Sequence, residues 1–160
     1  MKEGKQVNSN SEKRIIGRRE LVSLPELDIH EIEAKIDTGA YTSAIHCSNI
    51  HEETRSDGTM VIALDLLDPS HPQYNHKKLR FTEYELREIK SSFGEVQERY
   101  IIRTKIKFFD ETIEAEFSLS DRSDMKYPVL IGRKLLKGRF IVDVSRKNLA
   151  HKLKIKQNKK

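Results

Sequence analysis

Residues 29–40 of the chain read IHEIEAKIDTGA, and the fold prediction starts from this stretch. Ile32, Ala34 and Ile36 alternate with charged residues, which is the period of a β-strand with one buried face. The strand runs directly into Asp37-Thr38-Gly39. A carboxylate at a strand end, followed by a small hydroxyl residue and a glycine, is the first candidate for a chemical site.

Asp37, Thr38 and Gly39 have the composition of one half of an aspartic-peptidase site. Asp37 would supply one of two carboxylates that hold and activate a water, and the Thr38 hydroxyl would brace the loop against its symmetry mate. Gly39 has no Cβ, so two such loops can approach closely. Two carboxylates about 3 Å apart cannot both ionise, so the pair shares one proton. The same residue types are common in turns, so the tripeptide alone leaves an ordinary Asx turn open.

A second apolar motif lies far downstream, at Pro128–Arg133 (PVLIGR). It is followed by helix formers that end at Gly138 and by a strand-like RFIVDV stretch. There is also a weak internal echo, because Ile16-Gly17-Arg18-Arg19 resembles Ile131-Gly132-Arg133-Lys134. So short a match arises by chance as readily as from the internal pseudo-symmetry that small β barrels can carry.

The rest of the body predicts short strands. Residues 98–109 and 112–119 both alternate, and Asp110-Glu111 joins them, so we expect a β-hairpin. Residues 79–90 are ambiguous between an edge strand and a short helix. Many short strands with one short late helix predict an all-β barrel or sandwich.

In combination, these motifs resemble the retropepsin-like aspartic peptidases, in which Asp-Thr-Gly-Ala precedes an apolar-apolar-Gly-Arg motif and a short helix. More closely, the chain is similar to a small bacterial family labelled ATP-dependent zinc protease. The similarity covers residues from about 15 to 145 and rests on five stretches: 16–20 (IGRRE), 24–27 (LPEL), 34–46 (AKIDTGAYTSAIH), 97–100 (QERY) and 130–143 (LIGRKLLKGRFIVD).

The resemblance implies a small closed acid-protease barrel with one short C-terminal helix, and a homodimer with Asp37 at its seam. It implies catalysis by Asp37, Thr38 and Gly39 without a cofactor or metal. The predicted substrate-binding residues are Ala40, Thr42, Ser91, Ser92, Gly94 and Arg133. Members of the family often accompany an ATP-grasp ligase that adds glutamates to a protein tail, so a Glu-rich or ligase-modified peptide tail is the implied substrate.

Two features depart from the resemblance. Retroviral enzymes usually carry an acid directly after Asp-Thr-Gly-Ala that pairs with the motif arginine, but here that position is Tyr41, so Arg133 is expected to lack its usual partner. The family label names zinc and ATP, but the sequence contains neither a zinc-binding His-Glu-x-x-His motif nor a phosphate-binding Gly-x-x-x-x-Gly-Lys-Ser/Thr motif. His46, Cys47 and His51 are close in sequence but are weak evidence for zinc, and we expect His46 to pack near the active loop.

Residues 91–94 are equally consistent with a substrate-lining flap and with a plain hairpin turn.

Charge and length set the domain prediction. The 160 residues suit one domain, and their net charge of +5 comes from the ends, because positions 15–150 hold 21 basic and 23 acidic residues. We expect a disordered arm over 1–13, the barrel over 14–147 and a solvated basic tail over 148–160.

No apolar stretch approaches the roughly 18 to 20 residues of a membrane span. The start lacks a signal-peptide core, so a cytoplasmic location is expected, or a periplasmic one if a signal has been removed.

The sequence therefore predicts an aspartic endopeptidase that acts on a peptide or protein substrate, needs no nucleic acid or membrane, and has a functional link to an ATP-grasp ligase. The alternative is a non-catalytic peptide-binding or regulatory module on the same barrel. A zinc-dependent hydrolase is the third reading.

Overall fold

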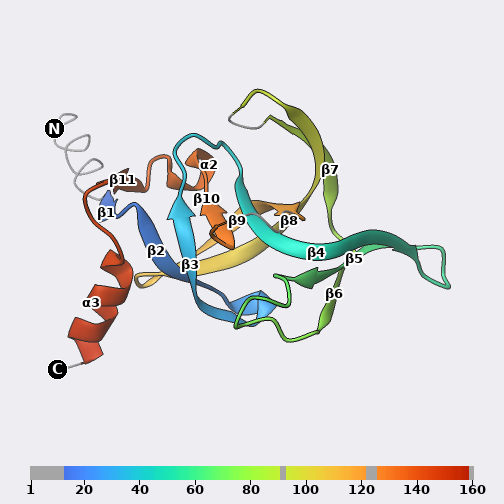
Figure 1. Ribbon diagram of the computed structural model, residues 1–160, viewed down its shortest axis with the longest axis horizontal. Coiled ribbons are helices and arrows are strands. Elements are labelled where there is room, and N and C mark those ends of the chain that lie inside the picture. The colour runs from blue at the N-terminus through green and yellow to red at the C-terminus, as the bar shows by residue number, and fades with distance from the viewer. Residues whose placement is uncertain (1–12, 91–92, 122–125, 159–160) are drawn as a thin grey trace, which may run out of the picture.

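The computed structural model describes residues 13–90, 93–121 and 126–158. Strands dominate these ranges (Figure 1). The elements are β1 (Arg14–Ile16), β2 (Arg19–Leu24), a 3₁₀ turn η1 (Pro25–Leu27), β3 (Ile29–Ile36), β4 (Ser43–Thr54), β5 (Met60–Leu66), β6 (Lys78–Phe81), β7 (Glu85–Lys90), β8 (Val96–Phe108), β9 (Glu111–Ser120), β10 (Val129–Ile131), α2 (Arg133–Leu136), β11 (Phe140–Val142) and α3 (Leu149–Asn158).

The main sheet closes on itself. Its strands pair in the order β10-β3-β2-β8-β9-β4, and β10 also pairs with β4, which completes a ring. β5 and β6 continue from β4, β7 pairs with β8, and β1 and β11 form a separate parallel pair. In Figure 1, the β4–β5 ribbon extends away from the ring, and the β7–β8 hairpin arches from it. The all-β fold expected from the sequence is confirmed.

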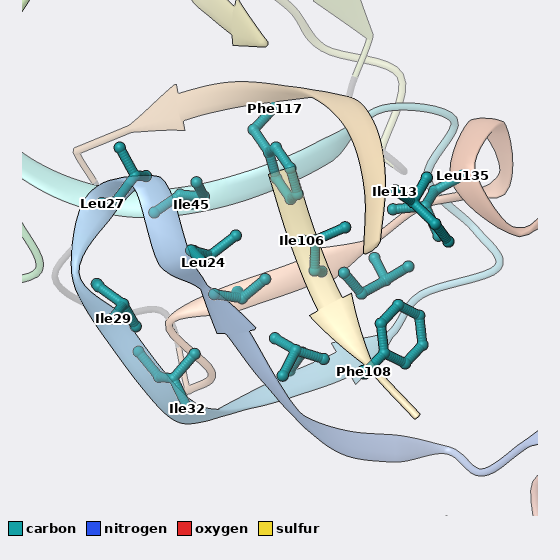
Figure 2. Close-up of a cluster of buried hydrophobic side chains, with 14 of the residues drawn as sticks. Leu24, Leu27, Ile29, Ile32, Ile45, Ile106, Phe108, Ile113, Phe117 and Leu135 are labelled. Atoms are coloured by element: carbon teal, nitrogen blue, oxygen red, sulfur yellow. The ribbon is translucent and has the colours of Figure 1, made fainter. Parts of the chain in front are cut away.

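The core fills the ring with aliphatic and aromatic side chains. Figure 2 shows residues from seven elements converging: Leu24, Leu27, Ile29, Ile32, Ile45, Ile106, Phe108, Ile113, Phe117 and Leu135. Each is 8% exposed or less. The apolar positions of the alternating segments are the buried ones, as the period of two predicts. Burial of a side chain of this size contributes about 1.5–3 kcal/mol, so the ring is held mainly by this cluster.

The predicted hairpin is present as β8 and β9, but its turn differs by one residue. Phe108 pairs with Glu111, so the two-residue turn is Phe109-Asp110 rather than Asp110-Glu111. Phe109 has φ 57°, the left-handed conformation that two-residue hairpin turns require. Its ring packs against Phe140 and under Arg14, and these contacts hold an aromatic residue where glycine or asparagine is commoner.

Three other segments resolve or change the expectations. Residues 79–90, ambiguous in sequence, contain strands β6 and β7. Residues 15–24 (IIGRRELVSL), whose pattern predicts one strand, are divided between β1 and β2 at Gly17-Arg18. Residues 149–158, expected as part of a solvated tail, form helix α3, in which Lys152 and residues 154–158 are exposed. The helix is anchored at its start, where the buried Ala150 donates its N–H to the buried Glu20 carboxylate at 2.9 Å. Residues 1–12 of the expected arm lie outside the described residues, and the domain boundaries stay predictions.

No helix within the described ranges is long and apolar enough to cross a membrane.

Candidate active site

Asp37 lies directly after β3, where the backbone is fixed by the neighbouring strand. Its N–H donates to the Ile131 carbonyl of β10 at 2.8 Å, continuing the parallel β3–β10 pairing. The Asp37 Oδ1 accepts the Gly39 N–H at 3.1 Å, and the Asp37 carbonyl accepts the Ala40 N–H at 3.2 Å. These bonds form an Asx turn over residues 37–40, called the aspartate turn below. Asp37 is half-buried, while Thr38 and Gly39 are exposed.

Gly132 of the Leu-Ile-Gly-Arg motif packs directly against the backbone at the end of the aspartate turn. A Cβ added at Gly132 would lie 2.7 Å from the Tyr41 carbonyl oxygen and 2.9 Å from that of Ala40, closer than any side chain tolerates. Because Gly132 has no side chain, the two backbones come close enough for a hydrogen bond. The Arg133 N–H donates to the Ala40 carbonyl at 2.8 Å. The glycine of the Leu-Ile-Gly-Arg motif is therefore required by packing against the turn.

Ser43 is a site residue that the sequence reasoning missed. Its buried Oγ accepts the Gly132 N–H at 3.0 Å, although the two residues are 89 positions apart. This bond satisfies a buried donor and joins β4 to the start of α2. A hydroxyl residue three positions after the predicted turn was the available signal, but only the tertiary structure shows its partner.

Arg133 has partners other than the missing acid. Its Nη1 donates to the Thr38 carbonyl at 3.0 Å, and its guanidinium carbon lies 5.8 Å from the centroid of the Tyr41 ring. The sequence predicted only that Arg133 lacks its usual acidic partner, and these two contacts are the ones that it makes instead. Tyr41 replaces the ion pair with a cation–π contact. Among the described residues, Arg133 forms no ion pair with a carboxylate.

Three further cations, from β7, β8 and α2, surround one carboxylate of β9. Lys134, Arg87 and Arg103 approach the Glu116 carboxylate at 2.6, 2.9 and 3.5 Å. The Arg87 guanidinium and then the Lys134 ammonium lower the pKa of Glu116 to about 2. Together with Arg133, these three cations form what we call the cationic strip, in which Arg87 also pairs with Glu85 at 2.8 Å and Arg103 with Glu114 at 3.3 Å. A cavity of about 200 Å³ lies along it, with Ser43, Arg103, Glu116 and Lys134 in its wall.

This arrangement can be compared with known proteins. The family described as retropepsin-like aspartic endopeptidase RimB matches residues 15–153. The chain belongs to this RimB-like family. The resemblance stated from the sequence motifs is confirmed, and the match includes both the aspartate turn and the Leu-Ile-Gly-Arg segment.

Curated relatives of this RimB-like chain carry a different name. Proteins named probable alpha-L-glutamate ligase from Shewanella halifaxensis and Desulfotalea psychrophila are 35% identical over 137 residues and 34% identical over 131 residues. The alignments cover 83% and 82% of this chain but 29% and 28% of those relatives, so the chain spans under a third of their length. A crystal structure of a Legionella pneumophila protein of unknown function has the same fold, with a TM-score of 0.64 and 23% identity over 86% of this chain and 98% of that one.

The three candidate zinc ligands of the RimB-like chain lie in different surroundings. The His46 side chain is buried, with its ring nitrogens 3.1 Å from the Ser120 carbonyl and 2.7 Å from the Asp68 carboxylate. Cys47 is buried in the core, and burial raises the pKa of its thiol to about 12. His51 is exposed and pairs with Glu53. In the described part of the chain, no three His, Cys, Asp or Glu side chains gather as a metal site would require.

The remaining predicted substrate residues have different positions. Ala40 and Thr42 flank Tyr41 at the end of the aspartate turn, and the Ala40 carbonyl holds the start of α2. Ser91 and Ser92 lie outside the described residues. Gly94 is in the β7–β8 connection next to Phe93, which is 90% exposed. A substrate-lining role for this hairpin stays a prediction.

Proposed function

We propose that the chain is one protomer of an aspartic endopeptidase whose site forms between two copies. The observation that carries the proposal is the aspartate turn. It fixes Asp37 by its backbone and by one carboxylate oxygen, and among the described residues Asp37 Oδ2 has no hydrogen-bond partner. Thr38 and Gly39 are exposed at the tip, so a second turn has room to approach. The RimB-like family match supports this reading.

The chemistry needs two carboxylates, and the chain has one Asp-Thr-Gly. Asp37 from each copy would share one proton, with the ionised member taking a proton from water and the protonated member donating to the carbonyl oxygen of the scissile bond. Hydroxide adds to the carbonyl carbon, and collapse of the tetrahedral intermediate breaks the C–N bond as the amine takes up a proton. Activity should therefore show a bell-shaped pH profile, since it falls when both carboxyls are protonated and when both are ionised.

The substrate we infer is a peptide tail rich in carboxylates. The cationic strip leads away from the aspartate turn, on a body whose net charge from 15 to 150 is negative. An acidic chain would find its complement there. The names of the ligase relatives support glutamate as the acidic residue and a functional link to an ATP-grasp ligase.

Catalysis is tested with Asp37→Asn and a matched control. Asparagine keeps the oxygen that accepts the Gly39 N–H, so the turn persists while the ionisable group is lost. Asp57→Asn is the control, because Asp57 Oδ1 accepts the Thr59 N–H at 2.9 Å in a similar turn on the β4–β5 hairpin. A digest of peptides ending in runs of glutamate should lose cleavage with Asp37→Asn alone. If Asp37→Asn cleaves as the wild type does, Asp37 is only a turn residue and the non-catalytic peptide-binding reading replaces the peptidase.

Substrate charge is tested separately. Arg103 belongs to the strip but, among the described residues, its guanidinium pairs with Glu114 and Glu116 rather than with the aspartate turn, and its side chain is 60% exposed. Arg103→Gln should raise KM for glutamate-ending peptides by up to about fivefold, with kcat unchanged, as loss of one exposed ion pair allows. Matched glutamine-ending peptides should show no such change. Equal effects on both peptides would remove the acidic-tail assignment and leave the peptidase proposal in place.

A further inference from the structure

The aspartate turn has an internal counterpart at residues 143–146, which we call the Asp143 turn. Asp143 directly follows β11, as Asp37 follows β3. Three bonds match in type and length. The aspartate N–H donates to an isoleucine carbonyl of the parallel strand at 2.8 and 2.9 Å, Oδ1 accepts the N–H two residues on at 3.1 and 3.0 Å, and the aspartate carbonyl accepts the N–H three residues on at 3.2 Å in both turns.

The glycine that packs against each turn is also repeated. Gly17 lies under the Asp143 turn, where an added Cβ would be 2.6 Å from the Arg146 carbonyl oxygen. The Arg18 N–H then donates to that carbonyl at 2.8 Å, the same bond length that joins the Arg133 N–H to Ala40. The sequence echo between residues 16–19 and 131–134 therefore has a common structural role. Each Ile-Gly-Arg segment receives an aspartate turn from the other half of the chain.

The two turns differ at the third residue, and this difference separates their chemistry. The Asp143 turn has Ser145, whose Oγ donates to Asp143 Oδ1 at 2.6 Å in addition to the backbone bond. Both bonds fall on Oδ1 and lower the pKa of Asp143. The aspartate turn has Gly39 there, so among the described residues Asp37 Oδ1 accepts only the Gly39 N–H. Asp143 thus has the geometry of a site turn with its oxygen used internally.

The Asp143 turn connects to Asp37 by backbone bonds alone. Its Arg146 carbonyl holds the Arg18 N–H, and the Arg18 carbonyl accepts the Ile36 N–H at 2.9 Å. Ile36 is the residue before Asp37 and belongs to the end of β3. One side of the Asp37 backbone is therefore fixed by β10, and the preceding residue is fixed through Arg18 by the Asp143 turn.

We propose that Asp143 is a positioning residue for Asp37, acting through Arg18 and Ile36 in an internally duplicated turn. The expected effect of Asp143 on peptide hydrolysis rests on the function proposed above. Its expected effect on the order of the Ile36–Asp37 backbone does not. The role needs only a hydrogen-bond acceptor at position 143. At position 37 the proposed chemistry needs an ionisable carboxylate.

The test compares Asp143→Ala, which removes the acceptor, with Asp143→Asn, which keeps it. Amide hydrogen exchange of Ile36 and Gly39 is measured by NMR, with the core amide of Ile106 as the reference for global opening. Asp143→Ala should speed exchange at Ile36 about tenfold relative to Ile106, the size expected when roughly one hydrogen bond is lost. Asp143→Asn should restore the wild-type rate. If Asp143→Ala does not fold, Asp143→Glu, which displaces the acceptor by one methylene, replaces it with the same expected result.

Activity supplies the second readout. With glutamate-ending peptides, Asp143→Ala should lower kcat with KM unchanged, and Asp143→Asn should restore kcat, whereas Asp37→Asn should not be active. Faster exchange confined to residues 14–19 and 140–148, or equal acceleration at Ile106, would overturn the positioning role. If the wild type cleaves no peptide, the peptidase proposal fails, while the exchange comparison still decides the role of Asp143.

Discussion

Glu116 places a carboxylate whose side chain is only 12% exposed among Arg87, Arg103 and Lys134. Arg87 also pairs with Glu85 and Arg103 with Glu114, but both of those carboxylates are more than half exposed, so Glu116 is the least exposed acid among the three cations. Removing that acid would leave the cations to repel one another, while removing a single cation leaves the carboxylate paired. The cationic strip therefore depends on this one residue for its arrangement, and its effect on stability should follow the protonation of Glu116.

Stability at Glu116 should depend on pH with a defined sign. Its pKa is lowered from the usual 4.5 to about 2 in the folded chain, so the ionised form stabilises the fold above pH 4.5 and this stabilisation is lost as pH falls toward 2. Glu116→Gln should reduce the free energy of unfolding at pH 7 by about 1–3 kcal/mol, and the difference should vanish near pH 2. Denaturant titrations at several pH values measure this. Glu114→Gln, at a carboxylate 57% exposed on the same strand, is the control, and an equal loss there would contradict the argument.

Local geometry was predictable where it depends on residue types within a short motif. Asp37, Gly39 and Gly132 belong to two such motifs, and the structure brings the motifs together, while their role in catalysis stays a prediction. Ser43 was not predictable, because a serine in a strand has many uses and its partner lies 89 residues away. The contact of Arg133 was not predictable either, because the backbone carbonyl of Thr38 carries no sequence signal.

At the scale of elements, α3 shows why a basic sequence need not be a frayed tail. The buried Glu20 carboxylate accepts the Gly17 N–H at 2.8 Å with one oxygen and the Ala150 N–H with the other. A carboxylate at the first turn of a helix satisfies a free donor and interacts favourably with the helix dipole. Glu31 adds an ion pair to Lys154 at 3.1 Å on the exposed side. Figure 1 shows α3 beside β2, at the outside of the ring.

Glu20→Ala should detach the start of α3. Two buried N–H groups would lose their acceptor, so the free energy of unfolding should fall by about 2–3 kcal/mol, with lower helical circular dichroism. Glu31→Ala is the matched control, since it removes an exposed contact to the same helix and should cost less than about 1 kcal/mol. Equal losses for both variants would show that the surface ion pair, not the buried carboxylate, holds α3.

For the whole molecule, the proposed chemistry requires a twofold dimer joined at the aspartate turns. Thr38 is exposed at the tip, so Thr38→Arg should block the approach of two turns and abolish both dimer and cleavage. Thr59→Arg, at the distant β4–β5 hairpin, should leave both intact. Sedimentation equilibrium measures assembly. A wild-type chain that stays strictly monomeric while it cleaves peptides would exclude this mechanism.

Metal removal tests the third reading of the sequence. A water held between two carboxylates needs no zinc, so prolonged chelation should leave cleavage unchanged at a given pH. The separate surroundings of His46, Cys47 and His51 are consistent with that expectation. Loss of cleavage on chelation, with recovery on added zinc, would instead favour a zinc hydrolase.

The amino-acid sequence by itself determined the alternating strands β3, β8 and β9, the β8–β9 hairpin to within one residue of its turn, the position of the aspartate turn and the family, because each depends on a period of two or on residue types within a few positions. The closure of the ring, the Ser43–Gly132 bond, the docking of α3 on Glu20 and the pairing of the Asp143 turn with Gly17 were decided only by the tertiary structure. These features join backbone groups and side chains up to 130 residues apart, as the Glu20–Ala150 bond does. A backbone N–H or carbonyl is the same at every position, so its distant partner is selected by how the strands pack.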